Sequence, residues 1–148
     1  MSKKFIWPLD KVYITQGFGE RPEYYKKYGM KGHNGVDLRT RHWDTPLGKM
    51  YVVSMDDGVV LEVVNPGTSG YGRYIKVKHT DGSTMLYGHL HKSYVYKGQV
   101  VKQGQRIGLT DNTGDSSGPH LHITYKPAKP NTANGFGGAE DPIPFIKK

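Results

Sequence analysis

The sequence contains no cysteine among its 148 residues. This absence excludes disulfide bonds, zinc sites built from thiolates and a cysteine nucleophile, and it suits a protein that works outside the cell. The chain also lacks any run of apolar residues long enough to cross a membrane as a helix, so we expect no transmembrane segment. A chain of this length can form one compact domain with a substantial buried core.

Acidic residues are scarce relative to basic ones. The 13 aspartates and glutamates face 21 lysines and arginines, which gives a formal net charge of +8. Such a surplus favours an anionic partner, either nucleic acid or a polymer of the bacterial envelope. The basic residues are scattered along the chain, whereas specific nucleic-acid binding gathers them in one helix or interleaves them with aromatic residues. We therefore expect no nucleic-acid partner.

Helical patterning is nearly absent as well. Residues 22–28 could form a short helical turn, but strand signals dominate the rest of the chain. Glycine-containing turns such as 56–58, 65–67 and 81–82 separate the apolar segments. The predicted strands are residues 59–64, 74–79, 84–87, 100–101, 108–110 and 120–125. The sequence thus predicts a mostly β, antiparallel fold with very little helix and with its chemistry at strand ends and in loops.

No linker divides the chain. We expect residues 1–148 to form a single domain with its core at about 5–125. Residues 126–148 would form a C-terminal tail, which is rich in proline, glycine and asparagine in its first part. Because residues 141–146 end in apolar side chains, we expect the end of the tail to pack back on the core.

Two glycine turns within residues 97–108 bracket a short strand at Val100 and Val101. This pattern is typical of the hairpins in barrel-sandwich domains, which carry biotin or lipoate. A carrier domain needs a lysine exposed at a hairpin tip between paired hydrophobic residues. This chain has no such tip, so we interpret these hairpins as scaffold.

Two motifs carry the candidate chemistry. His120 and His122 are separated by one residue, so on a strand both side chains lie on the same face. His33 and Asp37 also have an even spacing and could share one face of an extended segment. Together His33, Asp37 and His122 would supply two nitrogens and one oxygen. That set suits zinc with its fourth position open for water, as in hydrolytic zinc sites.

Six motifs in order resemble the lysostaphin-like (LytM-type) zinc metallopeptidases, the family that cleaves peptide bonds in bacterial peptidoglycan. The resemblance extends from Trp7 to Tyr125. It rests on Phe18-Gly19-Glu20-Arg21, His33-Asn34-Gly35-Val36-Asp37, Asp57-Gly58-Val59-Val60, Tyr87-Gly88-His89-Leu90, residues 101–108, and Asn112-Thr113-Gly114 leading to Gly118-Pro119-His120-Leu121-His122. Each motif alone is weak, but their order over so short a chain is specific.

The resemblance implies an antiparallel sheet that frames an open groove, with one zinc ion bound by His33, Asp37 and His122. It also implies that His89 and His120 are catalytic and that zinc-bound water is the nucleophile. Another class of zinc peptidase uses the glutamate of a His-Glu-x-x-His motif as its general base. This chain has no such motif, so a histidine must take the place of that glutamate. We assign the proton transfer from water to His120, while His89 orients the water or stabilises the intermediate. The two roles could be exchanged.

Three further residues are candidates for the site. Relatives often place a tyrosine shortly before the first zinc histidine to stabilise the oxyanion, and Tyr28 is the nearest match. Tyr71, which follows a Ser-Gly turn, is a candidate for lining the groove and binding substrate. His42 is a candidate for substrate contact. It lies in the segment 41–50, whose aromatic and basic residues depart from the family pattern.

The remaining histidines are interpreted as bystanders. On a continuing strand His91 would share a face with His89 and could reach the groove, but relatives usually have a small polar residue there. His79 precedes the turn at Asp81 and Gly82, and we expect it to be solvated.

The resulting hypothesis is a monomeric, zinc-dependent endopeptidase that hydrolyses the stem peptides or cross-bridges of peptidoglycan. One alternative is a catalytically silent envelope-binding or activator module of the same fold. Such modules typically lose zinc or catalytic residues, whereas all five are present here. Another alternative is a basic structural or nucleic-acid-binding domain whose histidines are incidental, which a metal assay would separate from the first two.

We expect the protein to act outside the cell or at the cell wall, with the periplasm as a second option. Residues 1–8 include basic residues but lack the apolar stretch of a signal peptide. Either a leader has been removed, or the protein reaches its target by another route, such as phage-driven lysis. The lack of a visible leader and of a wall-binding domain favours a phage source.

Overall fold

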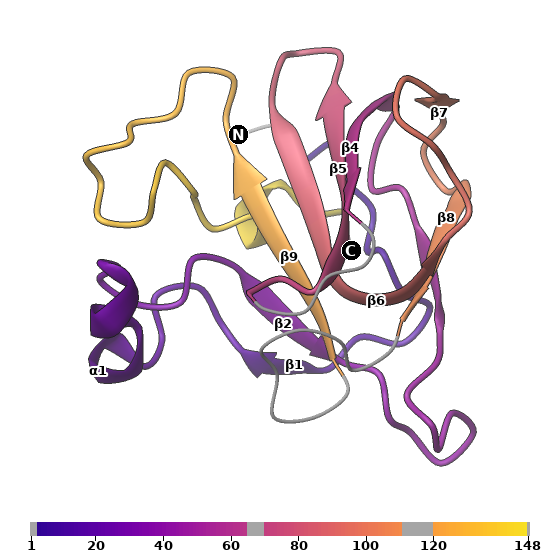
Figure 1. The fold of residues 1–148 in the computed structure, drawn as a ribbon, viewed down its shortest axis with the longest axis horizontal. Coiled ribbons are helices and arrows are strands. Elements are labelled where there is room, and N and C mark those ends of the chain that lie inside the picture. The colour runs from indigo at the N-terminus through magenta and orange to yellow at the C-terminus, as the bar shows by residue number, and fades with distance from the viewer. Residues whose placement is uncertain (1–2, 65–69, 111–119, 148) are drawn as a thin grey trace.

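The structure is a computed structural model that describes residues 3–64, 70–110 and 120–147 (Figure 1). The predicted turn at 65–67 and the motif residues 112–119 lie outside these ranges. Within them, the mostly β and antiparallel fold expected from the sequence is confirmed.

One sheet of nine strands organises the described residues. Its order is β1-β2-β9-β6-β5-β4-β7, while β8 pairs with β6 and β3 pairs with β8. All of these pairings are antiparallel. The strands are β1 (Ile14–Gln16), β2 (Val36–Arg39), β3 (Tyr51–Val53), β4 (Gly58–Val64), β5 (Arg73–His79), β6 (Thr84–Ser93), β7 (Val100–Val101), β8 (Arg106–Thr110) and β9 (His120–Lys126).

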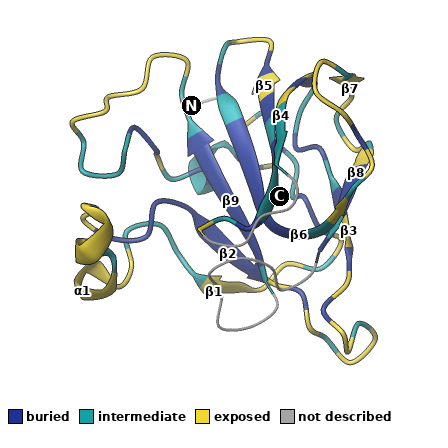
Figure 2. Cartoon of the chain, viewed as in Figure 1, coloured by how far each residue is buried: buried dark blue, intermediate teal, exposed yellow. Residues whose placement is uncertain are grey.

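The middle of the sheet is its most buried part. Figure 2 shows β9 largely buried, with neighbouring strands on both sides. Leu121, Ile123 and Tyr125 are buried, and so are the polar residues His122 and Thr124 between them, which shows that both faces of this strand are covered. The residues of β9 therefore have fixed surroundings on both faces.

Strand β5 shows the ordinary period of two, and it corrects one sequence expectation. Ile75, Val77 and His79 are buried while Lys78 is exposed. His79 was expected to be solvated, which is wrong: it is only 3% exposed. Its Nδ1–H donates to the Asp57 carbonyl oxygen (2.8 Å). The reason is that residue 79 continues the inward-facing set of its strand, which the proximity of a turn does not change.

The helical content is small, as predicted. Helix α1 (Pro22–Tyr25) is followed directly by the 3₁₀ helix η1 (Lys26–Tyr28). A proline in the first turn suits a helix start, because its missing N–H has no helical partner there. Gly29, with φ of 73°, ends the segment in the left-handed region that glycine adopts without strain.

Three strands were less visible in the sequence. The short strands β1 and β3 were not predicted, and their residues are mostly exposed or half-buried. The sequence prediction also ends the strand after Tyr87, whereas β6 continues to Ser93 through an irregular register around residue 89. The segment 97–108 is built into the sheet through β7 and β8, in agreement with its interpretation as scaffold.

The C-terminal tail returns to the start of the chain. The backbone N–H groups of Lys4 and Phe5 both lie 3.0 Å from the Phe145 carbonyl oxygen, and Lys147 N–H donates to the Phe5 carbonyl oxygen (2.7 Å). The ring centroids of Phe145 and Tyr125 are 5.4 Å apart. A second 3₁₀ helix, η2 (Ile143–Phe145), forms this contact.

Neither the helix nor the 3₁₀ turns found in the described part of the chain has the length and apolar character needed to span a bilayer.

We predict that Phe5→Ala destabilises the protein strongly. Phe5 is fully buried, and its ring packs against those of His79 and Tyr125. Removing a buried phenyl ring typically costs about 3–5 kcal/mol. Denaturant unfolding would measure this loss, with Val100→Ala as the control: Val100 is exposed, so its truncation should change the free energy of unfolding by less than about 0.5 kcal/mol. Equal stability of the two variants would contradict the prediction.

Candidate metal centre

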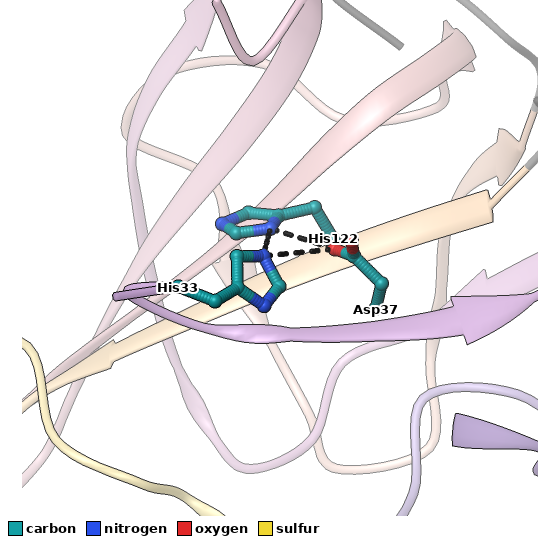
Figure 3. A group of neighbouring side chains, drawn as sticks. All are labelled: His33, Asp37 and His122. Carbon is teal, nitrogen blue, oxygen red and sulfur yellow. Dashed lines mark hydrogen bonds and ion pairs between the residues drawn. The ribbon is translucent and has the colours of Figure 1, made fainter. Parts of the chain in front are cut away.

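Three side chains that could hold a metal ion converge on one point. Asp37 on β2 lies directly opposite His122 on β9 in the antiparallel register. His33 comes from the loop before β2, and Figure 3 shows its ring turned toward the other two side chains. Asp37 Oδ1 lies 2.9 Å from His122 Nδ1 and 3.3 Å from His33 Nε2, and the two nitrogens are 3.1 Å apart. This is the ligand group predicted from the sequence.

The spacing of these atoms fits zinc. Zinc in a tetrahedral site binds imidazole nitrogen and carboxylate oxygen at about 2.0–2.1 Å, which puts neighbouring ligand atoms roughly 3.3 Å apart. The three observed separations of 2.9, 3.1 and 3.3 Å are close to that value. The donor set and its geometry therefore suit a zinc ion bound on one side by protein and open on the other.

The outer nitrogens of both imidazole rings are held by hydrogen bonds. His33 Nδ1–H donates to the Gly17 carbonyl oxygen (3.2 Å), and His122 Nε2–H donates to Thr124 Oγ1 (2.6 Å). When the proton is on each outer nitrogen, the inner nitrogens can bind a metal ion in place of donating to Asp37. Such outer contacts fix the tautomer and the orientation of metal-binding histidines.

The protonation states of the cluster also favour metal binding. Burial opposes ionisation of Asp37, but the hydrogen bonds from His122 and His33 outweigh it and hold the pKa of this carboxyl below its usual range. Burial lowers the pKa of His122, and the nearby Asp37 carboxylate only partly opposes this. A carboxylate beside a neutral imidazole is the state that a metal ion requires of these ligands.

Gly35 explains why the loop before β2 can approach β9 so closely. A Cβ atom at this position would lie 2.8 Å from His122 Cε1 and would collide with the Ile123 carbonyl oxygen. Any larger residue would therefore push the loop that carries His33 away from the ring of His122. The glycine of the His-Asn-Gly-Val-Asp motif is required by packing.

The two predicted catalytic histidines lie beside this cluster. His120 begins β9, and its Nε2 is 3.6 Å from Asp37 Oδ2, so His120 and His122 both reach Asp37 as expected for one face of a strand. The ring of His89 lies 4.7 Å from that of His120 and 6.2 Å from that of His122, between centroids. The structure thus brings all five predicted residues together.

The backbone of His89 is unusual. Its φ of 62° is in the left-handed region, which non-glycine residues rarely adopt. The register of β6 is irregular on both sides of this residue, and the His89 N–H donates to the Tyr71 carbonyl oxygen (2.7 Å). A bulge of this kind re-aims a side chain, and here it directs the ring of His89 toward His120.

Tyr71, a predicted groove residue, stacks on a metal ligand. Its ring centroid is 5.1 Å from that of His122 at an interplanar angle of 29°. Its hydroxyl oxygen accepts a hydrogen bond from Asn34 Nδ2 (2.8 Å). Asn34 was not singled out by sequence reasoning, although it stands inside the motif of His33 and Asp37.

Tyr25 of helix α1 contacts the candidate metal centre. Its ring stacks on His33 with centroids 5.1 Å apart, and burial together with the nearby Asp37 charge raises its pKa. Tyr28 is 48% exposed and packs against Tyr24 and Tyr25. The sequence signal was ambiguous because three tyrosines precede His33 within a few residues.

His42 and His91 lie outside the cluster. His42 Nε2–H donates to the Arg39 carbonyl oxygen (3.1 Å) in the turn that follows β2. His91 lies near the end of β6, where its carbonyl oxygen accepts a hydrogen bond from Arg73 (3.3 Å). The bulge at His89 breaks the period of two on which a shared face for His89 and His91 was expected.

An antiparallel β fold with a His/Asp/His ligand group and two adjacent histidines is that of a metallopeptidase domain. The chain belongs to peptidase family M23, because the sequence profile described as "Peptidase family M23" matches residues 31–133. The resemblance to lysostaphin-like peptidases inferred from the motifs is thereby confirmed.

Individual relatives agree with this assignment. Peptidoglycan DD-endopeptidase ShyB of Vibrio cholerae is 38% identical over 119 residues, which are 79% of this chain and 26% of ShyB. A zinc-containing peptidase from Vibrio cholerae superimposes with a TM-score of 0.72 at 32% identity, over 95% of this chain and 39% of that one. The catalytic domain of lysostaphin from Staphylococcus simulans gives a TM-score of 0.71 at 30% identity, over 90% and 91%. The chain thus spans about a quarter of ShyB.

We predict that Gly35→Ala weakens zinc binding by about 10–100-fold, the usual effect of disturbing the contacts that orient a metal ligand. The added methyl group displaces the loop of His33 from the ring of His122. Competition with a chromogenic chelator would measure zinc affinity, and circular dichroism would verify folding. Asp37→Ala, which removes a ligand directly, provides the reference for a broken site. Wild-type affinity in a folded Gly35→Ala variant would refute the packing argument.

Proposed function

We propose that this protein is a zinc-dependent endopeptidase that hydrolyses peptide bonds in the stems or cross-bridges of bacterial peptidoglycan. The observation that supports this most is the convergence of three metal-ligand atoms with the rings of His89 and His120. Membership of the M23 family gives the reaction class, and the name of ShyB gives the substrate class.

We propose one zinc ion per chain, bound by His33 Nε2, Asp37 Oδ1 and His122 Nδ1. When bound, zinc polarises a carbonyl group and lowers the pKa of water from 15.7 to about 7. The three ligand residues fix the position of the ion, and the hydrogen bonds to Gly17 and Thr124 hold the two rings in place.

The histidines beside the ligands would move the protons. His120 accepts a proton from the attacking water, because its ring lies between the Asp37 carboxylate and the ring of His89. His89 orients the water and delivers a proton to the leaving amine. The imidazole group is suited to both steps because it titrates near neutral pH.

Aromatic residues beside the two metal-binding histidines would hold the substrate. Tyr25 keeps its phenolic proton near neutral pH, as an ordinary tyrosine does, and its raised pKa strengthens this, so it is available to donate to the developing oxyanion. Tyr28, the residue favoured by the sequence pattern, is the second candidate for this role. Tyr71 and His42 are proposed to contact the peptide, Tyr71 beside His122 and His42 beyond the end of β2.

We further propose that residues 1–148 act as one peptidase domain, as a monomer, at the cell wall or in the periplasm. A formal charge of +8 would increase the time that the domain spends on an anionic wall. A catalytically silent module would be expected to have lost ligands or catalytic histidines, whereas the complete set supports an active enzyme.

The proposal is tested by mass spectrometry of fragments released from purified peptidoglycan. Glycine-bridged walls and directly cross-linked walls would be digested separately by the zinc-loaded protein, with a chelator-treated sample as control. We expect new peptide termini in at least one wall type, and these termini identify the cleaved bond. If the zinc-loaded protein releases nothing from either wall, the silent binding module replaces the proposal.

We predict that His89→Ala and His120→Ala each reduce turnover by about 10²–10⁴-fold, the usual contribution of a general acid or base. Both variants should keep one zinc ion per chain, because neither residue belongs to the three-ligand group. Parallel measurement of zinc content and of peptide release separates the two effects. Stoichiometric loss of zinc from His120→Ala would show that this residue is a ligand, contrary to the assignment.

A further inference from the structure

A second cluster of exposed side chains lies away from the metal centre. It combines aromatic rings with cationic groups stacked on them, and we call it the aromatic–basic face. Trp43 is 91% exposed, and Tyr51 and Tyr94 are also exposed. The residues that define this face are Lys11, Trp43, Tyr51, Lys92, Tyr94 and Arg106.

Direct contacts join these residues into two groups, and both groups contribute to the lining of one pocket. Lys11 Nζ lies 5.5 Å from the ring of Trp43, and the Arg106 guanidinium carbon lies 4.0 Å from the ring of Tyr51. The rings of Tyr51 and Tyr94 are 6.2 Å apart, and Lys92 Nζ is 5.5 Å from Tyr94. A run of exposed aromatic area of this kind is unusual on a protein surface unless it binds something.

A pocket of about 460 Å³ lies within the same surface. Lys11, Tyr51 and Arg106 line it together with apolar side chains that include Trp7 and Met50. Pockets that bind small units of a ligand combine a mostly apolar lining with a few polar groups at fixed positions. The aromatic–basic face therefore offers both a flat stacking area and a recess.

The charges in the pocket indicate what it can bind. Three cationic residues, Lys11, Lys49 and Arg106, stand beside two carboxylates, Asp10 and Asp44. Asp44 forms an ion pair with Lys11, so the five groups together carry little net charge and attract a polymer of phosphates only weakly. A sugar can use both kinds of group, since its oxygens accept from the cations and its hydroxyl groups donate to the carboxylates. Its C–H faces also stack on aromatic rings, whose faces carry partial negative charge.

The face is connected to the metal centre through two elements. Strand β2, which carries Asp37, continues through residues 40–50 to Tyr51 on β3, and Figure 2 shows this connection as a mostly exposed loop. Strand β6 carries both His89 and Lys92, and Leu90 between them pairs with Thr110 of β8. Lys92 of the face is thus three residues from His89 on the same strand.

We propose that the aromatic–basic face binds the glycan strand of peptidoglycan, with sugar rings stacked on Trp43 and Tyr51 and one sugar unit in the adjoining pocket. The choice of this glycan rests on the proposed function. Binding of the strand here places the peptides attached to it close to the metal centre.

Two measurements on the zinc-loaded full chain test this proposal. The first is binding to peptidoglycan glycan strands from which an amidase has removed the peptides. Trp43→Ala and Tyr51→Ala should each bind about tenfold more weakly, as expected for loss of one stacking contact. The matched control is Tyr13→Ala: Tyr13 is an exposed tyrosine with Arg39 over its ring at 5.5 Å, directly before β1 and outside the face. It should bind as the wild type does.

The second measurement compares peptide release from intact peptidoglycan with cleavage of a cross-linked peptide free of sugar. Trp43→Ala should slow release from the wall and leave cleavage of the free peptide unchanged. If the wild type cleaves neither substrate, the proposed enzymatic function is wrong. The binding assay would still test whether the aromatic–basic face binds glycan.

Three outcomes would overturn the proposal. They are absence of wild-type binding to stripped glycan, equal binding by the wild type and both aromatic variants, and retention by a polyol-phosphate polymer in place of glycan. The last outcome would assign the face to an anionic polymer, and its strong dependence on salt would identify it.

Discussion

The pairing of β2 with β9 is the constraint on which the site depends. Asp37 lies opposite His122 in this register, and Gly88 of β6 lies opposite His122 on the other side. One residue of β9 is therefore flanked by a metal-ligand carboxylate and by the strand that carries His89. A slip of one residue would turn the ligands of β9 to the other face of the sheet and separate all three groups. The depth of burial around β9 makes such a slip costly.

Burial of the cluster disfavours the charge on Asp37, and contacts within the cluster offset this cost. A carboxylate and two imidazole rings lie almost out of contact with solvent, where a single charge is strongly disfavoured. Asp37 keeps its charge because His33 and His122 surround it, while the outer nitrogens of the rings are bound to Gly17 and Thr124. When the outer nitrogens keep their protons, the two inner nitrogens and the carboxylate present three acceptors to one point, and a divalent cation is the natural counter-charge for them.

The sequence predicted the ligand group from two even spacings and from the resemblance of its motifs to a family. His120 and His122 do follow the period of two on β9. His33 lies in the loop before β2, so its spacing from Asp37 does not reflect strand geometry. No comparable signal pointed to Tyr25, because the choice among three nearby tyrosines depends on how helix α1 packs against His33. Likewise, His79 was misjudged because a turn nearby outweighed the strand period in the prediction. The bulge at His89 depends on pairing with both β5 and β8, which no local pattern contains.

The β-bridge between Phe5 and Ile146 has a consequence for the connectivity of the chain. Because these residues form a parallel bridge, the two described ends of the chain are held side by side and the backbone makes a nearly closed circuit. Proteins with adjacent termini tolerate circular permutation and insertion into the loops of other proteins. The exposed turn around Gly82 between β5 and β6 offers a place to open the circuit without cutting the strands that hold the ligands. Opening the chain at this turn would leave β2 paired with β9, and with it the placement of Asp37 opposite His122.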